Sequence, residues 1–262
     1  MCGNSTNAKD REELLAGATP EVMLTDPPYC SRGHQESGKS TGSIGTVRKG
    51  QPDAPKIAND ILSTRGYIKL LTAAFEGITP LFAYVFTDWR MWIYLYDIIE
   101  KSGFGVRSML VWDKESPGMG VGWRSQHELC IFGSRGKAKF DGHKGYGNVL
   151  RCSRSGNELH PTQKPVELFE QILDNMDFVK TVYDPFGGSG TTLAAAEKTG
   201  HTAYIMELTP EYTDVIVKRY FRIAGKDQIK LIRDGEEMPP EYYAEVFGDL
   251  GISPEYQEGE YE

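Results

Sequence analysis

The stretch that decides the fold is Val22-Met23-Leu24-Thr25-Asp26-Pro27-Pro28-Tyr29, an apolar run that leads directly into an acid, two prolines and an aromatic ring. The run predicts a short strand that ends near Asp26. In open α/β sheets, ligands bind at the carboxyl ends of the strands. Each proline fixes its own φ and pushes the residue before it towards extended conformations. We therefore expect the Asp26 carboxylate, the Pro27 carbonyl and the Tyr29 ring to keep a fixed relation.

Two acceptors beside a flat apolar ring suit a planar group that carries an exocyclic NH2, such as a nucleobase. A second interpretation is a proline-containing turn that ends a strand, with Asp26 as its cap and Tyr29 half buried. Because short motifs match by chance, these residues alone leave both interpretations open.

Around this stretch, apolar runs alternate with amphipathic segments, which predicts an α/β fold with a mostly parallel sheet flanked by helices. Two runs joined by a glycine-rich link, 110–112 and 129–132, predict an antiparallel strand at one edge of the sheet. The predicted strands are 22–24, 81–86, 106–112, 129–132, 181–183 and 203–207, and the predicted helices are 68–75, 91–100, 166–176, 192–198 and 211–223.

Length and composition are those of an ordinary globular protein. The 262 residues, 39% hydrophobic and 25% charged, fit one large α/β domain with insertions or two small domains. No run is long enough to span a bilayer and the N-terminus lacks a signal pattern, so we expect no membrane partner. The four cysteines are scattered without a C-x-x-C pair. This pattern argues against a disulfide framework or a metal site and favours a cytoplasmic protein.

The net charge of −8 is unevenly distributed along the chain. Segment 234–262 carries ten acids and no Lys or Arg, and without it the chain has 29 basic and 27 acidic residues. Two long glycine-rich segments, 30–66 and 134–159, are basic and lack periodicity. Long loops of this kind are often lids or binding loops. Plain surface insertions are the alternative, but the charge favours contact with a polyanion.

A second motif, Thr181-Val-Tyr-Asp-Pro-Phe-Gly-Gly-Ser-Gly-Thr-Thr192, predicts a strand, a glycine turn and the start of a helix. Glycines let a backbone approach a ligand closely, and a helix N-terminus offers free N–H groups. The next predicted strand ends in Glu207, the position that holds ribose hydroxyls in nucleotide-binding folds. A tight turn and a surface Glu are the alternative, but the spacing favours a cofactor that carries an adenosine.

Together these motifs resemble those of S-adenosylmethionine-dependent DNA amino-methyltransferases. The stretch from Asp184 looks like their Phe-x-Gly-x-Gly cofactor loop, and Thr25-Asp-Pro-Pro-Tyr29 looks like their catalytic motif. His160-Pro-Thr-Gln-Lys-Pro165 is similar to the segment before that loop, and Gln126-His-Glu128 resembles their last-strand motif. The catalytic motif comes first here, a permuted order that resembles the beta class. RNA and protein methyltransferases with a similar motif carry it after the cofactor loop, which disfavours them.

The resemblance implies a Rossmann-like methyltransferase sheet with basic loop insertions, and it divides the chain into four parts. These are a catalytic half over 1–133 with the long loop 30–66, a DNA-recognition insertion over 134–159, a cofactor-binding half over 160–233 and an acidic tail over 234–262.

The resemblance also implies roles for single residues. Asp26 and the Pro27 carbonyl would accept the two N–H bonds of an exocyclic amine, Pro28 would stiffen the motif, and Tyr29 would stack on a base flipped out of the duplex. His127 and Glu128 are expected to be structural. The residues implied for S-adenosylmethionine are Asp184, Phe186, Gly187, Gly188, Gly190, Glu207, Lys164, Thr162 and Asn4. Asn4 stands where many relatives have an acid. For Lys164 and Thr162, a structural segment before a helix is the alternative.

Double-stranded DNA is the implied partner, held by a monomer or a homodimer with or without a cognate restriction nuclease. Asp before Pro-Pro-Tyr goes mostly with adenine N6 in this family, so we expect adenine as the target, with cytosine N4 as the alternative. A catalytically idle DNA-binding relative is a second function to weigh. The candidate DNA contacts are Arg32, Lys39, Arg124, Arg135, Lys137, Lys139, Lys144, Arg151 and Arg154.

Overall fold

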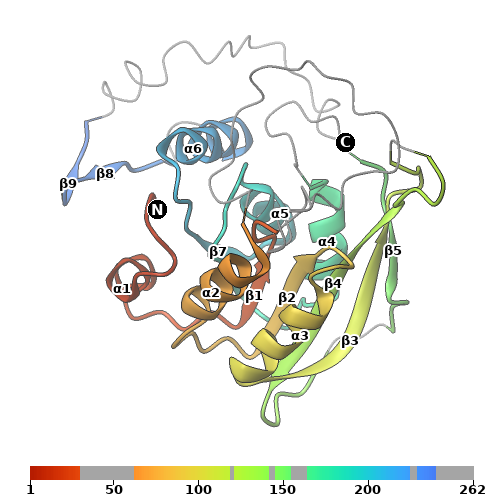
Figure 1. The fold of residues 1–262 in the computed structure, drawn as a ribbon. Helices are drawn as coiled ribbons and strands as arrows, with labels where there is room; N and C mark the ends of the chain where they lie inside the picture. Colours follow the sequence, from red (N-terminus) through yellow and green to blue (C-terminus); the bar gives the residue numbers. More distant parts are fainter. Residues whose placement is uncertain (30–61, 119–120, 142–144, 155–163, 225–228, 240–262) are drawn as a thin grey trace.

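A seven-stranded sheet in the order β5-β3-β4-β2-β1-β6-β7 organises the computed structural model (Figure 1). The structure describes residues 1–29, 62–118, 121–141, 145–154, 164–224 and 229–239. The strands are β1 (Val22–Thr25), β2 (Phe82–Thr87), β3 (Phe104–Asp113), β4 (His127–Arg135), β5 (Val149–Arg151), β6 (Thr181–Asp184) and β7 (Thr202–Ile205), and a separate hairpin pairs β8 (Ile232–Arg233) with β9 (Glu236–Glu237). The helices are α1 (Ala8–Leu15), α2 (Thr64–Ala74), α3 (Trp92–Lys101), α4 (Val166–Asp174), α5 (Thr191–Thr199) and α6 (Pro210–Ala224).

The central strand is β1, the strand predicted from the opening stretch. It pairs in parallel with β2 on one side and with β6 on the other. Every residue of β1 and of β2 is buried. Strands that are covered on both faces read as continuous apolar runs. This is why these two strands were recognisable in the sequence without any alternation of polar residues.

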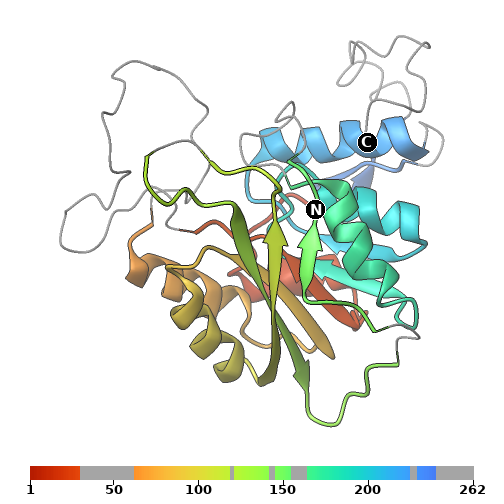
Figure 2. The ribbon, with the colours of Figure 1, turned by 90° about the vertical axis from the view of Figure 1, so that its right-hand side faces the viewer.

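Two hydrophobic cores cover the two faces of the sheet. Val22 and Leu24 of β1 pack in one core with residues of α4 and α5, while Met23 points the other way into a core with α2 and α3. This division follows from the alternation of side chains along a strand. Figure 2 shows the arrangement from the side, with the orange and yellow helices on one face and the green and cyan helices on the other.

The mostly parallel sheet is confirmed, but its antiparallel strand is not at the edge. β4 runs antiparallel to both β2 and β3, and β3 and β5 lie outside it. The edge strand β5 pairs in parallel with β3. It was missed because it has only three residues, of which the first and last are exposed. It also lies inside the glycine-rich segment predicted as an insertion.

Two further elements were not predicted. Asn7 caps α1 by accepting a hydrogen bond from the Lys9 amide, and the buried Arg11 of that helix donates to the Ser5 and Glu76 carbonyls at 2.6 and 2.9 Å. The hairpin β8–β9 spans position 234, where the acidic tail was predicted to begin. Most of that tail lies outside the described residues. Within the part of the chain that is described, no helix combines the length and apolarity that crossing a bilayer requires.

Candidate active site

The predicted catalytic and cofactor residues that the structure describes lie at one end of the strands, the end where β1, β2, β3, β6 and β7 finish. Asp26 follows β1, Asp184 ends the neighbouring β6, and Glu207 lies just beyond β7. β4 runs in the opposite direction and therefore begins at this edge with His127 and Glu128. The topology thus brings together residues that are far apart in the sequence, as expected for an open α/β sheet.

A buried lysine contacts the predicted catalytic motif. The Lys164 ammonium lies 2.5 Å from Asp26 Oδ2, 3.0 Å from Glu128 Oε2 and 3.2 Å from the Tyr29 hydroxyl. Its side chain is only 4% exposed, against 22% for Asp26. Lys164 was expected beside the cofactor, and the structure places its charged end against Asp26, the acid predicted to be catalytic. The two carboxylates explain why the pKa of Lys164 is raised although burial alone would lower it.

Glu128 is the second acid of this cluster. Its Oε2 accepts a hydrogen bond of 2.7 Å from the Tyr29 hydroxyl as well as the contact from Lys164, and its Oε1 pairs with Lys114. Burial would raise the pKa of Glu128, but the two lysines outweigh burial and lower it to about 2. Glu128 is therefore ionised throughout the neutral range and can hold both a phenol and an ammonium in place.

Asp26 has the opposite pKa shift. Burial is the largest cause and raises its pKa, the Glu128 carboxylate adds to the increase, and Lys164 opposes both. Aromatic rings surround the cluster, since the Lys164 ammonium lies 5.5 Å from the centroid of Tyr29, 5.7 Å from Phe86 and 5.9 Å from Trp112. Asp26 Oδ2 is bonded to Lys164, whereas Asp26 Oδ1 is buried and has no hydrogen-bond partner among the described residues. Buried acceptors are usually completed by a protein group, a water or a ligand.

The predicted cofactor loop is anchored by Asp184. Its Oδ1 accepts hydrogen bonds from the Thr25 hydroxyl at 2.6 Å and from the Phe186 amide at 3.0 Å, and its Oδ2 accepts one from the Thr192 hydroxyl. The carboxyl is 2% exposed, and burial raises its pKa to about 6 against those three donors. Asp184 therefore fixes the loop from within and is not exposed to a ligand.

The glycines of the loop differ in what they do. A Cβ on Gly187 would lie 2.5 Å from Ile205 Cγ2, so this glycine allows the loop to pack on β7. Gly190 has φ +82° and precedes α5 as its N-cap, with Ile216 of α6 3.2 Å from the position of a Cβ. Gly188 has φ +52° and nothing within 4 Å of that position. Gly188 thus leaves an open side on the loop where a ligand can approach the backbone.

Glu207 is connected to this loop. Its Oε2 accepts a hydrogen bond of 2.9 Å from the Gly188 amide, and its Oε1 accepts one from the Thr209 amide at the same distance. The Gly3 amide donates to the Glu207 carbonyl at 2.9 Å, so Asn4 directly follows a residue that is bonded to Glu207. Asn4 is exposed, and its Oδ1 already accepts two hydrogen bonds from Thr6. The carboxylate of Glu207 keeps lone pairs for further donors, so it suits ribose hydroxyls.

The candidate DNA contacts that the structure describes fall into two groups, one at each end of the strands. Arg151 ends β5 beside Asp113 at the edge that carries Asp26, and the Arg154 guanidinium approaches Gly118 in the loop between β3 and β4. Arg124 lies in the same loop and is exposed. Arg135, at the far end of β4, lies over the Phe104 ring and donates to the Ile78 carbonyl. Lys137 and Lys139 follow Arg135 at that far end of the strands, so these three residues are separated from the cluster around Asp26. Arg32, Lys39, Lys144 and Thr162 lie outside the described residues.

Four residues of the site were not predicted. Lys114 pairs with Glu128, and Trp112 forms part of the apolar wall. The buried Arg219 of α6 donates to the Ser189 carbonyl at 3.2 Å and so supports the glycine loop. Trp123 is fully exposed in the loop between β3 and β4. Only Trp123 carried a signal in the sequence, as an isolated tryptophan among glycines.

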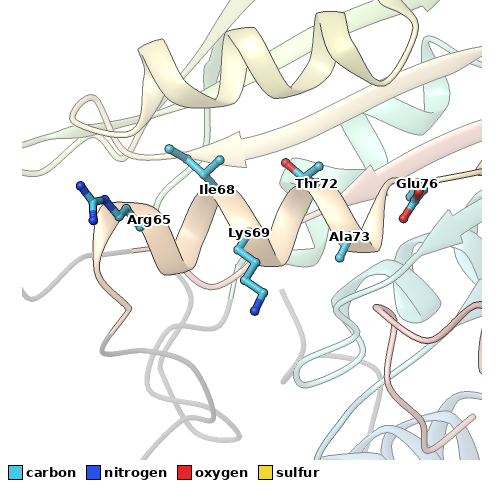
Figure 3. A pocket seen from close by; sticks show the side chains of 6 residues that line it. All are labelled: Arg65, Ile68, Lys69, Thr72, Ala73 and Glu76. Carbon is cyan, nitrogen blue, oxygen red and sulfur yellow. The ribbon is translucent and has the colours of Figure 1, made fainter.

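A shallow hollow of about 450 Å³ lies elsewhere, on the outer face of α2 (Figure 3). All its lining residues come from this helix or the residue positions just after it, namely Arg65, Ile68, Lys69, Thr72, Ala73 and Glu76. A binding site normally has polar groups that converge from several elements. This hollow shares no residue with the cluster around Asp26, and we do not regard it as the active site.

Comparison with known proteins agrees with this geometry. The model of the N6/N4 family described as DNA methylase matches residues 21–218. The Type II methyltransferase M2.DpnII of Streptococcus pneumoniae is 25% identical over 245 residues, which cover 80% of this chain and 87% of that protein.

Two solved structures share the fold. M1.HpyAVI in its complex with SAM has a TM-score of 0.60 at 21% identity, covering 84% of this chain and 97% of its own. The cytosine-N4-specific PvuII DNA methyltransferase has a TM-score of 0.58 at 16% identity, covering 95% and 90%. Because the family model spans both strand-end motifs and most of the sheet between them, the chain belongs to the N6/N4 DNA methylase family.

Proposed function

We propose that this protein transfers a methyl group from S-adenosylmethionine to the exocyclic N6 amine of adenine in double-stranded DNA. One observation carries the proposal beyond family membership. Asp26 presents a buried oxygen, Oδ1, that lacks a hydrogen-bond partner in the described part of the chain, beside the Tyr29 ring and the two prolines. An amine that donates an N–H bond would complete this acceptor.

The described residues fit the cofactor. Gly188 leaves space at the loop backbone, and Glu207 beside it offers a carboxylate for the ribose hydroxyls. The related fold of M1.HpyAVI was solved with SAM, which supports the same assignment here. When bound, S-adenosylmethionine supplies a methyl group that is activated by a positively charged sulfonium. Phe186 and Gly188 are the loop residues that would border it, while Asp184 and Gly187 keep the loop in shape.

The residues of the catalytic motif would prepare the amine. The lone pair of the amine nitrogen is delocalised into the base, so this nitrogen must become tetrahedral to react. Asp26 Oδ1 and the Pro27 carbonyl, as two fixed acceptors, favour that geometry by preorganised electrostatics. The amine gains a carbon and loses one proton. Asp26, with its raised pKa, is able to hold that proton before it passes to solvent.

DNA would approach the edge of the sheet that carries Asp26. Arg124, Arg151 and Arg154 lie at this edge and are exposed, as is Trp123. Arginines on phosphates position a duplex, and aromatic rings stack on bases that have left the helix. This face replaces the one expected from the basic run after Arg135, which is at the other end of the strands.

The choice of adenine rests on the acid at position 26, because Asp before Pro-Pro-Tyr goes mostly with adenine N6 in this family. Cytosine N4 is the alternative, since its amine also offers two N–H donors and a fold neighbour is cytosine-N4-specific. The beta-class motif order, the oligomeric state and a cognate nuclease stay predictions.

The test is direct. Duplex DNA is incubated with the purified chain and S-adenosylmethionine carrying a deuterated methyl group, and the nucleosides are analysed by mass spectrometry. We expect the labelled mass on deoxyadenosine. Asp26→Ala serves as the control and is expected to lose most of the transfer while it still binds the cofactor. Label on deoxycytidine alone would replace adenine by cytosine, and no label on any base would refute the proposal.

A further inference from the structure

Glu128 lies at the centre of the catalytic cluster although it belongs to neither of the two principal motifs. It is bonded to three side chains from three other elements: Lys114 after β3, Tyr29 after β1 and Lys164 before α4. Its side chain is 17% exposed, and that of Lys114 is 12% exposed. A residue that only fixed the start of β4 would need none of these contacts.

The two carboxylate oxygens of Asp26 have different surroundings, because Lys164 contacts only one of them. Its ammonium holds Oδ2 at 2.5 Å, while Oδ1 is buried without a partner among the described residues. The same ammonium touches Glu128 and the Tyr29 hydroxyl. A free carboxylate can rotate about its last bond. A carboxylate whose one oxygen is fixed by a buried ammonium has its other oxygen fixed as well.

We propose that Glu128 and Lys164 are positioning residues for methyl transfer, with Glu128 holding Lys164 and Tyr29, and Lys164 orienting Asp26 so that Oδ1 faces the target amine. This inference rests on the proposed function and assigns to these two residues a role in the reaction itself. Lys114 is the outer support, since it binds the oxygen of Glu128 that the other two residues leave free.

The charges around Asp26 make the proposal testable. The groups that influence it electrostatically are Lys164, Glu128 and Lys114, and Asp26 in turn influences Tyr29, Cys130 and Asp184. Glu128 raises the pKa of Asp26, whereas Lys164 lowers it. Removal of the Glu128 charge should therefore lower the pKa of Asp26, and removal of the Lys164 charge should raise it. Nearby charges at such distances shift a pKa by about one to three pH units.

The experiment measures the single-turnover rate of methyl transfer to duplex DNA as a function of pH. The variants are Glu128→Gln, which keeps the shape and an acceptor for Tyr29, Lys164→Met, which removes the charge, and Lys164→Arg, which keeps it. The acid limb is the part of the profile in which the rate falls as Asp26 becomes protonated. We expect this limb to move by about one pH unit, to lower pH in Glu128→Gln and to higher pH in Lys164→Met. In Lys164→Arg we expect the acid limb at the same pH as in the wild type, with a lower maximal rate of methyl transfer. Dissociation constants for S-adenosylhomocysteine stay within about threefold in all three.

Lys198→Met is the matched control, because Lys198 of α5 also pairs with a glutamate, Glu170 of α4, at 3.0 Å, and this pair shares no residue with the cluster around Asp26. Its acid limb should be that of the wild type. If the wild type methylates DNA and the limbs of Glu128→Gln and Lys164→Met coincide with it, the positioning role is refuted and the function stands. If the wild type transfers no methyl group, the function itself fails. Should Lys164→Met not fold, the downward shift in Glu128→Gln decides alone.

Discussion

The Thr25 hydroxyl donates a hydrogen bond of 2.6 Å to Asp184 Oδ1, so the residue before the proposed catalytic acid is tied to the residue that anchors the proposed cofactor loop. The two residues end neighbouring strands, β1 and β6, and are 159 positions apart in the chain. This hydrogen bond thus adds a side-chain link between the two halves of the proposed site, whose strands already pair in parallel.

Thr25→Val tests this connection. The variant keeps the shape but removes a donor to a buried carboxylate, and hydrogen bonds to charged groups contribute about 1.5–3 kcal/mol. We expect a loss of unfolding free energy in that range, measured by urea denaturation, together with slower methyl transfer. Thr213→Val removes a hydroxyl that donates only to the Thr209 carbonyl of its own helix region, and it should cost less. Equal losses in the two variants would contradict the special role of the pair.

Asp184 gives the protein a distinctive pH dependence. Its pKa is about 6 in the folded state against 3.8 as the ordinary value, so between these pH values the folded state binds a proton that the unfolded state has released. The stability contributed by this group is therefore full below about pH 4 and is lost as pH rises to about 6. The difference corresponds to about 3 kcal/mol.

Asp184→Asn should remove that dependence. The amide keeps an acceptor for Thr25 and Phe186 and can donate to Thr192, so at pH 7.5 the variant is expected to be at least as stable as the wild type. Urea titrations from pH 4 to pH 8 compare the slopes. A wild type and a variant with parallel pH profiles would show that Asp184 does not titrate in this range.

The glycine loop yields a prediction that separates binding from folding. Gly188→Ala meets open space, and its φ of +52° costs about 1 kcal/mol for a residue with a Cβ. We expect weaker binding of S-adenosylmethionine by calorimetry with little loss of stability. Gly187→Ala would place a Cβ 2.5 Å from Ile205 and should unfold at lower temperature. If Gly188→Ala binds the cofactor as the wild type does, the ligand does not approach that side of the loop.

The positions of most strands along the chain and the two strand-end motifs were predictable because they depend on local pattern, whereas the order of the strands in the sheet was not predicted. β1 and β6 are apolar runs that end in Asp-Pro, and glycines with positive φ mark the turn after β6. The role of Glu128 was not predictable, since its three partners come from segments that only the folded sheet brings together. The same holds for Arg135, whose position far from Asp26 follows from the antiparallel direction of β4. A basic run in the sequence carries no information on which end of a strand it will occupy.

We expect the DNA face at the strand ends that carry Asp26, away from Arg135 at the other end of β4. Exchanging Arg151 and Arg154 together for Gln should reduce the slope of log affinity against log salt by about 2, since each lost phosphate contact contributes about 0.9. Lys137→Gln with Lys139→Gln, at the far edge of the sheet, should leave the slope unchanged. Fluorescence anisotropy with a labelled duplex between 50 and 200 mM salt, roughly the range in which such contacts dominate, measures both. The reverse result would move the DNA to the other edge.

Trp123 should contribute to DNA binding without a charge. Its side chain is fully exposed in the loop between β3 and β4, where an indole gains nothing in the free protein. The Gly118 amide donates a hydrogen bond of 2.9 Å to the Ser125 carbonyl, two residues after Trp123. Stacking of a base on an aromatic ring is worth about 1–3 kcal/mol. Trp123→Ala is therefore expected to weaken duplex affinity about tenfold with an unchanged salt slope, because no phosphate contact is lost. Tyr96→Ala removes another exposed ring, on the outer side of α3, and should have no effect. A change in the salt slope of Trp123→Ala, or equal losses in the two variants, would show that the indole does not meet a base.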